Sequence, residues 1–232
     1  MNTSNESQKK MQNGYLGSKI RSQTFAYIVG NGIYLNLTNR CTNDCTFCLR
    51  NNGDTAYGSN SLWLEREPSP EEVIEQVKEI FFDNCDGFVF CGYGEPTCRF
   101  DALIETARML KSAYPDYPIR LNTNGQSELI NSKESTKSLF GLIDSISISM
   151  NASNENDYDK LCHSVFGKRA YQAMLDFASN CVGNIPVVQF SVVETTLSDS
   201  DIEKCKETVD KIGAKLRVRK FISENDKNPE GN

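Results

Sequence analysis

The chain contains 232 residues, 38% of which are hydrophobic, and its formal net charge is −6 at pH 7. This length favours one sizeable domain or at most two small ones. The negative charge argues against a broad nucleic-acid-binding face, although it leaves room for a local basic site that binds one nucleotide or RNA end. No apolar run approaches the roughly 18–20 residues of a membrane helix, so we expect no membrane partner.

The cysteines and the N-terminus indicate the compartment. Nine cysteines, an odd number with three in a tight cluster, argue against a disulfide framework and for a reducing environment. The N-terminal residues are polar and lack the apolar segment of a secretion signal. We therefore expect a cytoplasmic protein.

The chain begins with a polar, aperiodic stretch, and we predict disordered tails over residues 1–22 and 223–232 around one core domain over residues 23–222. The domain opens with a predicted β-hairpin, in which strands 24–29 and 33–38 flank a glycine turn. A long loop follows the second strand. It is either functional or a surface excursion that Trp63 anchors to the core.

Strands and helices then alternate along the chain. A capping box, Ser-Pro-Glu-Glu at 69–72, begins a helix that continues to Phe81. The later helices are predicted over residues 101–114, 132–142, 167–179 and 198–212, and the later strands over residues 87–91, 119–123, 145–150, 186–193 and 214–221.

This order indicates an α/β fold. Strict alternation implies a parallel sheet with right-handed crossovers, whether the sheet is open or curved. In either case the functional side chains should lie at the carboxyl ends of the strands.

Three cysteines follow the first strand of the parallel series. Cys41, Cys45 and Cys48 have the spacing C-x3-C-x2-C, with Phe47 directly before the last. This spacing lets three thiolates converge on one face of an iron–sulfur cube or on one small metal. A 4Fe–4S cube has four irons, so three local cysteines without a close fourth leave one iron for a non-protein ligand.

Two alternatives involve no catalysis. A zinc-stabilised binding module usually has C-x2-C pairs or a nearby histidine, and His163 is remote in sequence and interpreted as structural. An iron–sulfur electron carrier or redox sensor requires a fourth protein ligand.

The cysteine triad resembles the signature of the radical S-adenosylmethionine (radical SAM) superfamily. The resemblance implies that Cys41, Cys45 and Cys48 hold a 4Fe–4S cluster, whose open iron is chelated by S-adenosylmethionine. It implies a six-stranded partial (β/α)6 TIM-like barrel, with the short hairpin strand before it. It also implies reductive cleavage of the cofactor to a 5′-deoxyadenosyl radical, which abstracts hydrogen from a substrate, with the electron supplied by a reductant such as flavodoxin or ferredoxin.

A second motif, Gly-Tyr-Gly-Glu-Pro-Thr over residues 92–97, follows the next predicted strand. Its glycines allow close backbone approach to a ligand, and the Glu95 carboxylate can accept hydrogen bonds from an ammonium group. The motif resembles the G-G-E-P of the same superfamily, which holds the methionyl amino group. Tyr93 replaces the second glycine and a further glycine follows, so the match is a variant. The alternative is an ordinary turn between a strand and a helix.

Polar residues also mark the later strands. Residues 121–125 read Leu-Asn-Thr-Asn-Gly, and the superfamily often has a similar T-N-G there. Alternation places Ser147, Ser149 and Asn151 on one face of their strand. Arg217 and Arg219 share a face of the last strand, either as solvated surface or as a site for an anionic substrate. The predicted cofactor-binding residues are Phe47, Gly92, Gly94, Glu95, Asn122, Thr123, Ser149, Gln189 and Ser191.

The cysteines outside the triad have a weaker pattern. Cys85, Cys91 and Cys98 could hold an auxiliary cluster, but Cys91 lies in a predicted buried strand, where cysteine behaves as a small hydrophobe. Among the remaining thiols, Cys98 is the best placed to act as a partner thiol. Cys162 and Cys181 are interpreted as packing residues.

Within the superfamily, the runs over residues 39–51, 92–97 and 121–126 are similar to those of the radical SAM proteins associated with TatD-family hydrolases. This resemblance implies a functional link to a metal-dependent hydrolase. It gives no substrate, which is a small molecule, a nucleotide or a peptide.

Overall fold

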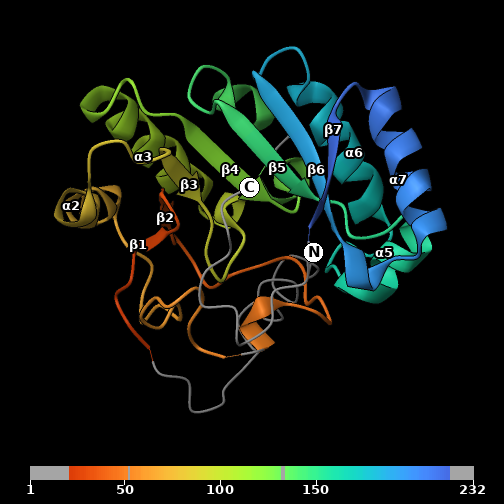
Figure 1. Cartoon of the computed structure of the whole chain (residues 1–232), viewed down its shortest axis with the longest axis horizontal. Helices are drawn as coiled ribbons and strands as arrows, with labels where there is room; N and C mark the ends of the chain where they lie inside the picture. The colour runs from red at the N-terminus through yellow and green to blue at the C-terminus, as the bar shows by residue number, and fades with distance from the viewer. Residues whose placement is uncertain (1–20, 52, 132–133, 220–232) are drawn as a thin grey trace, which may run out of the picture.

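The computed structural model describes residues 21–51, 53–131 and 134–219. They form one seven-stranded sheet whose strand order follows the chain, from β1 to β7 (Figure 1). The first two strands pair antiparallel, and each later strand pairs parallel with the one before it. The strands are β1 (Ala26–Val29), β2 (Gly32–Leu35), β3 (Phe88–Phe90), β4 (Ile119–Thr123), β5 (Ser145–Ser149), β6 (Val187–Val193) and β7 (Lys215–Arg219). The predicted α/β class and mostly parallel sheet are confirmed.

The α-helices connect the parallel strands. They are α2 (Pro70–Ile80), α3 (Phe100–Ala113), α4 (Ser127–Ile130), α5 (Glu155–Cys162), α6 (Arg169–Cys181) and α7 (Asp199–Ile212). Short 3-10 turns cover Leu49–Asn51 (η1), Pro96–Arg99 (η2), Thr136–Leu139 (η3) and Glu194–Thr196 (η4). None of the helices in the described ranges is long and apolar enough to cross a membrane.

Local chemistry explains where two of these helices begin. The Ser69 side chain accepts from the Glu72 amide and the Glu72 side chain accepts from the Ser69 amide, which completes the predicted capping box of α2. Ser198 caps α7 in the same way by accepting from the Asp201 amide. Both predicted helix starts are confirmed.

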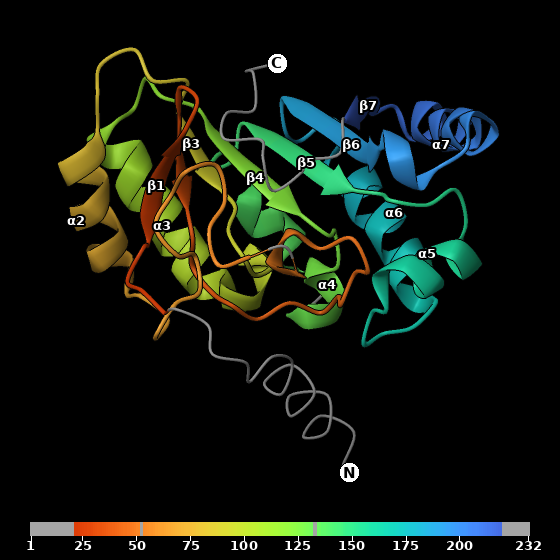
Figure 2. The ribbon, with the colours of Figure 1, turned by 60° about the horizontal axis from the view of Figure 1, so that its bottom comes forward.

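The two faces of the sheet differ because side chains alternate along each strand. Apolar residues such as Leu121, Ile148 and Phe190 are fully buried in the main core, together with apolar residues of the helices. Figure 2 shows α3, α4 and α6 on this side of the sheet. The intervening residues, such as Asn122 and Ser149, point to the opposite face and are half-buried. We call this polar side the inner face.

One helix prediction is wrong, and one helix was not predicted. The helix predicted over residues 132–142 is replaced by α4 and η3, and residues 132–133 lie outside the described part. Serine and threonine side chains bond locally there, Ser127 to Ser135 and Thr136 to Glu128, and such bonds compete with helix formation. Helix α5 was not predicted, because its eight residues are mostly polar and only Tyr158 and Cys162 are buried.

A second, smaller core cluster fixes the long loop after the cysteines. It consists of Tyr27, Val29, Ala56, Leu62, Trp63 and Tyr93. The Trp63 ring is 5% exposed and meets the Tyr93 ring edge-on, with 5.1 Å between the ring centroids. The interpretation of Trp63 as the anchor of this loop is confirmed.

The predicted tails lie almost wholly outside the described residues. Arg21 and Ser22 are the exceptions, because Arg21 Nη1 donates to the Leu64 carbonyl at 3.2 Å and Ser22 forms a parallel bridge with Leu64.

Candidate metal and cofactor site

A cavity of about 270 Å³ lies at the carboxyl ends of the strands. In Figure 1 the orange segment that follows β2 and carries the cysteines lies at this end of the sheet. Most of the predicted site residues line the cavity, namely Cys41, Cys45, Phe47, Cys48, Gly92, Gly94, Glu95, Asn122, Thr123 and Ser149. Gln189 and Ser191 do not line it, although they pair with Ser147 and Ser149 on the same sheet face.

The three thiols surround the cavity without meeting at a point. No three cysteine, histidine or carboxylate side chains within the described ranges are grouped to hold a single metal ion. In a 4Fe–4S cube each thiolate binds a different iron, so an arrangement around a cavity suits a cube better than one zinc ion.

The surroundings of the cysteines supply donors to sulfur. The Asn43 amide donates to Cys41 Sγ at 3.4 Å, and Arg50 Nε donates to Cys48 Sγ at 3.2 Å. Burial raises the pKa of the Cys41 thiol to about 12, and the nearby Arg50 guanidinium opposes that shift. A cationic ligand such as iron would favour the thiolate form.

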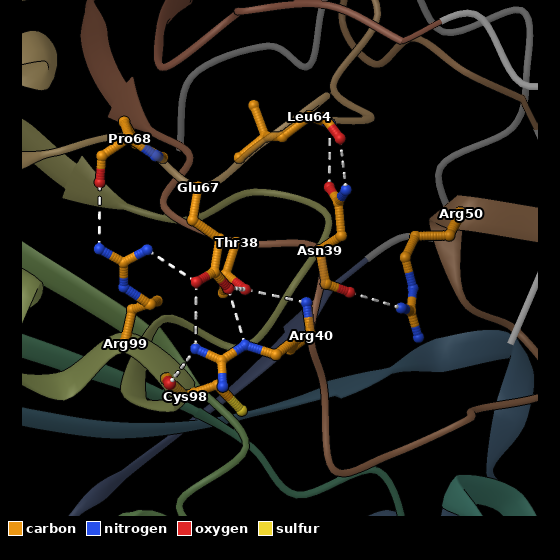
Figure 3. A network of polar contacts seen from close by, with 9 residues as sticks. All are labelled: Thr38, Asn39, Arg40, Arg50, Leu64, Glu67, Pro68, Cys98 and Arg99. Atoms are coloured by element: carbon orange, nitrogen blue, oxygen red, sulfur yellow. Dashed lines mark hydrogen bonds and ion pairs between the residues drawn. The ribbon is translucent and has the colours of Figure 1, made fainter. Parts of the chain in front are cut away.

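The cysteine loop is held from one side by an ion-pair network around Glu67 (Figure 3). Glu67 Oε1 accepts from Thr38 Oγ1 at 2.6 Å and from Arg40 Nε at 2.7 Å, and Glu67 Oε2 accepts from Arg99 Nη1 at 2.7 Å. Arg40 also donates to the Cys98 carbonyl at 2.8 Å. Burial alone would raise the pKa of Glu67, but the hydrogen bonds from these donors outweigh it and hold the pKa below its ordinary value.

From the other side, a buried amide network holds the same loop. Gln126 Oε1 accepts from Thr42 Oγ1 at 2.8 Å, and Gln126 Nε2 donates to Asn43 Oδ1 at 2.8 Å. The Tyr158 hydroxyl accepts from Asn43 Nδ2 and from Gln126 Nε2, each at 3.0 Å. These residues were not predicted from the sequence. The signals were a glutamine directly after the Thr-Asn-Gly run and a tyrosine within an otherwise polar segment.

Helix α5 also contacts the cysteine loop through its backbone. The Asp44 amide donates to the Cys162 carbonyl at 2.9 Å, and the Thr46 amide donates to the Leu161 carbonyl at 3.0 Å. The unpredicted helix therefore positions the middle of the cysteine motif.

Cys162 is more than a packing residue. It is fully buried, and its Sγ accepts from Asn151 Nδ2 at 3.7 Å. The interaction of its thiol with that of Cys45 raises the pKa of Cys45 and lowers that of Cys162. The expectation that no further cysteine lies near the triad is wrong, because α5 folds back across the loop and brings Cys162 there.

The glycines of the Gly-Tyr-Gly-Glu-Pro run permit close approach of the chain to itself. A Cβ at Gly92 would lie 2.1 Å from Asn36 Oδ1, and one at Gly94 would lie 2.3 Å from the Thr38 carbonyl oxygen. The substituting Tyr93 turns into the smaller core cluster and donates to the Gly53 carbonyl at 2.9 Å. The variant motif thus joins the cysteine loop to the long loop behind it.

The Glu95 carboxylate is buried and held by protein donors. Its Oε1 accepts from the Thr97 amide at 3.1 Å, the Thr97 hydroxyl at 2.8 Å and the Thr123 hydroxyl at 2.7 Å. Its Oε2 accepts only from the Asn124 amide, at 2.7 Å, and so retains capacity for a further donor. Burial raises the pKa of Glu95, and the hydrogen bonds oppose this shift.

Two amide oxygens in the cavity wall lack donors. Asn122 Oδ1 and Asn151 Oδ1 are buried and have no hydrogen-bond partner among the described residues. Asn151 has φ of 58°, an uncommon backbone conformation for a residue other than glycine. Unpaired buried acceptors favour a ligand with N–H or O–H donors, such as an amino acid ammonium group or ribose hydroxyls. The residues present therefore fit both a cluster and S-adenosylmethionine.

The remaining cysteines are separated. Cys85 is buried in the main core, and Cys91 lines the cavity beside Asn122. Cys98 does not line the cavity, so the prediction that it is the best-placed partner thiol is wrong. The reason is that η2 turns the chain away from the cavity after Pro96. His163 ends α5 with φ of 44°, which agrees with a structural role.

Comparison with known proteins extends these observations. The family model of the radical SAM superfamily matches residues 35–209. The structure is similar to a radical SAM methyltransferase from Sphaerobacter thermophilus, with a TM-score of 0.60 and 18% identity over 84% of this chain and 57% of that one. It is also similar to Streptococcus suis SuiB, with a TM-score of 0.56 and 15% identity over 82% of this chain and 39% of that one.

A structure of SuiB bound to S-adenosylmethionine is similar as well, with a TM-score of 0.55 and 13% identity over 83% of this chain and 41% of that one. These likenesses show the fold, and the chain spans little more than half of the methyltransferase and less than half of SuiB. No curated protein is significantly similar to the chain in sequence.

Proposed function

Because the chain belongs to the radical SAM superfamily, and is thus a radical SAM enzyme whose cofactors are a 4Fe–4S cluster and S-adenosylmethionine, we propose that its strand-end cavity binds both cofactors. When bound and supplied with one electron by a reductant, they would provide a 5′-deoxyadenosyl radical to abstract a hydrogen atom from the substrate. The sheet would serve this chemistry as a six-stranded partial barrel from β2 to β7, preceded by the hairpin strand β1.

The proposed roles follow from the positions of the side chains. Cys41, Cys45 and Cys48 would each bind one iron. Glu95 Oε2 accepts a hydrogen bond from the cofactor ammonium group, while Thr123 and the Asn124 amide hold this carboxylate in place. The carboxylate moves no proton.

Further residues complete the proposed cofactor site. Phe47 and the backbone of Gly92 and Gly94 border the cavity, and Asn122 and Ser149 offer polar groups to the cofactor. Two predicted cofactor-binding residues, Gln189 and Ser191, lie outside the cavity lining but on the same sheet face. Their proposed contacts with the cofactor are therefore on the inner face beyond the cavity.

One observation carries this proposal. Three thiols, the Glu95 carboxylate and two unpaired amide oxygens line one cavity, although they come from four separate segments of the chain. A zinc-binding module would have no use for these acceptors in the same cavity as the thiols.

Two partners are proposed on chemical grounds and on resemblance. Reductive cleavage of a sulfonium takes one electron, which a reductant such as flavodoxin or ferredoxin would deliver. A functional link to a TatD-family hydrolase rests on the similarity of the runs over residues 39–51, 92–97 and 121–126.

Cys162 favours a second candidate function. Its thiol contacts that of Cys45, so it could become the fourth protein ligand of the cluster. A cluster ligated by four cysteines would leave no iron for S-adenosylmethionine, and the protein would then be an electron carrier or redox sensor.

The two functions differ in an anaerobic spectroscopic test. The protein is reconstituted with iron and sulfide, reduced, and measured by electron paramagnetic resonance with and without S-adenosylmethionine, while 5′-deoxyadenosine is assayed in the same samples. We expect the signal to shift on addition of the cofactor, with slow release of 5′-deoxyadenosine.

The matched variants are Cys45→Ala, which should lose both readouts, and Cys85→Ala, which removes a thiol of the main core and should keep them. An unchanged signal without cofactor cleavage under several reductants would favour the electron carrier.

A further inference from the structure

Three arginines stand on the inner face of the sheet. Arg120 lies on β4, and Arg217 and Arg219 lie two residues apart on β7, so that alternation points their side chains to the same side of the sheet. Arg219 lines the cofactor cavity. Arg120 and Arg217 line a second cavity of about 680 Å³, at the amino ends of the strands. A line of positive charge therefore extends along the inner face from one cavity into the other.

Two of these guanidinium groups are not fully satisfied. Arg120 Nε and Arg219 Nε are buried and have no hydrogen-bond partner among the residues that the structure describes. Arg120 makes one bond to a neutral group, from Nη2 to the Tyr34 hydroxyl at 2.9 Å. This differs from the cysteine loop, where Arg40 and Arg99 both pair with Glu67.

Two other arginines are charged neighbours of Arg219. Burial lowers the pKa of Arg219, and the charges of Arg217 and Arg120 lower it further. The groups that oppose this shift are the Tyr57 hydroxyl and the Cys91 thiol. Among the residues that line the second cavity, Asp86 contributes a carboxylate. A guanidinium whose buried Nε has no acceptor is unfavourable unless an anion binds it.

We propose that the substrate of this enzyme is an anion, whose carboxylate or phosphate group binds Arg120 and Arg219 on the inner face while its reacting carbon extends into the cofactor cavity. This inference rests on the proposed function and adds the chemical class of the substrate. Arginine suits the role because its planar fork of N–H donors matches both oxyanions. Arg219 lines the cavity that would hold the cofactors, and Arg120 lines the one that would hold most of the substrate.

The binding test needs no cofactor and no known substrate. Isothermal titration calorimetry on the full chain at low ionic strength uses succinate and pyrophosphate as probes, which distinguish a carboxylate from a phosphate site. We expect one saturable site for at least one probe. Arg120→Gln and Arg219→Gln should each weaken it at least tenfold. Arg108→Gln is the matched control, because Arg108 is exposed on α3 and pairs with Glu105, and it should leave binding unchanged.

Thermal unfolding shows whether the variants fold. Because the buried Nε of Arg219 is unpaired, the melting temperature of Arg219→Gln should be equal to or above that of the wild type. The proposal is overturned if neither probe binds, or if both probes bind the wild type and the two inner-face variants equally.

A second titration separates this inference from the proposed function. The affinity of the cluster-loaded protein for S-adenosylmethionine should be the same in Arg120→Gln, Arg219→Gln and the wild type. A loss of cofactor affinity in Arg219→Gln, with anion binding retained, would assign Arg219 to the cofactor and overturn the proposal. Anion binding without any cofactor cleavage would refute the proposed function and leave the anion site standing.

Discussion

At the scale of single residues, the role of Cys162 determines whether the protein itself ligates three irons of the cluster or four. Its thiol contacts Cys45, but it lies at the end of α5, beneath the loop, and does not line the cavity. We therefore expect Cys162→Ala to keep its cluster, with iron content and the spectroscopic shift on cofactor binding close to the wild type.

The matched change is Cys48→Ala, which removes a proposed ligand that lines the cavity. If Cys162→Ala instead lost iron as Cys48→Ala should, Cys162 would be a ligand and the electron-carrier function would gain support.

Gly94 shows how one missing Cβ shapes the site. An alanine there would place Cβ 2.3 Å from the Thr38 carbonyl oxygen and 2.5 Å from that of Arg40, and backbone atoms cannot turn aside as a side chain can. We expect Gly94→Ala to lower the free energy of unfolding by roughly 1–3 kcal/mol. Urea denaturation measures this change. Gly32→Ala is the control, because its nearest neighbour is the edge of the Tyr34 ring at 3.1 Å. Equal midpoints for the two variants would contradict the argument.

At the scale of elements, Glu67 joins the segment after β2 to η2 and to the start of α2. Its pKa in the folded protein is lowered, because the hydrogen bonds from Thr38, Arg40 and Arg99 outweigh the effect of burial. The ionised form therefore stabilises the folded state at pH values above about 4.5, the range of an unfolded glutamate. This contribution is lost as the pH falls through the lower, folded-state value.

Unfolding free energies measured from pH 7 to pH 3 should reveal the effect. Glu67→Gln should be less stable than the wild type at neutral pH, and the difference should shrink as the pH falls below about 4.5. Glu105→Gln changes an exposed carboxylate on α3 and should show no such convergence. If the difference in unfolding free energy between Glu67→Gln and the wild type stayed constant across this range, the network would stabilise the fold through packing and neutral hydrogen bonds rather than through the charge of Glu67.

At the scale of the whole molecule, the cofactor site connects β2, β3, β4 and α5. A cluster that binds only the folded state should therefore stabilise the entire domain. For a ligand at a hundredfold excess over its dissociation constant, we expect a rise in melting temperature of roughly 5–10 °C on reconstitution. Removal of iron with a chelator should reverse the shift, and Cys45→Ala should show none. The same shift in Cys45→Ala would mean that the metal binds elsewhere.

Much of this architecture could be predicted from the sequence. Alternation in 119–123 and 145–149 marked β4 and β5, and Ser69 and Ser198 marked the starts of α2 and α7. Helix prediction failed where the hydrophobic pattern of the sequence is weak. Helix α5 is short and polar, and it is stabilised by contacts with the cysteine loop that are distant in sequence.

The motifs of the candidate site could be predicted from the sequence, but the residues that hold the cysteine loop in place could not. The cysteine spacing and the Glu-Pro run are local, so residues such as Cys41 and Glu95 were found. Gln126, Tyr158 and Cys162 reach the same loop only because the sheet brings its strand ends together. Arg217 and Arg219 were correctly placed on one face, but the sequence could not show that Arg219 is half-buried beside the cavity.

The smaller core cluster has an optical consequence. Trp63 is the only tryptophan of the chain, and its ring lies against Tyr93 and 6.0 Å from the Arg50 guanidinium, whose Nε contacts Cys48. Its fluorescence therefore originates from one known place beside the cysteine loop. Iron–sulfur clusters absorb the light that a buried indole emits, so the intensity of Trp63 emission should fall as the cluster assembles. The emission should shift to longer wavelength if the loop opens. The protein thus contains its own reporter for the assembly of its site.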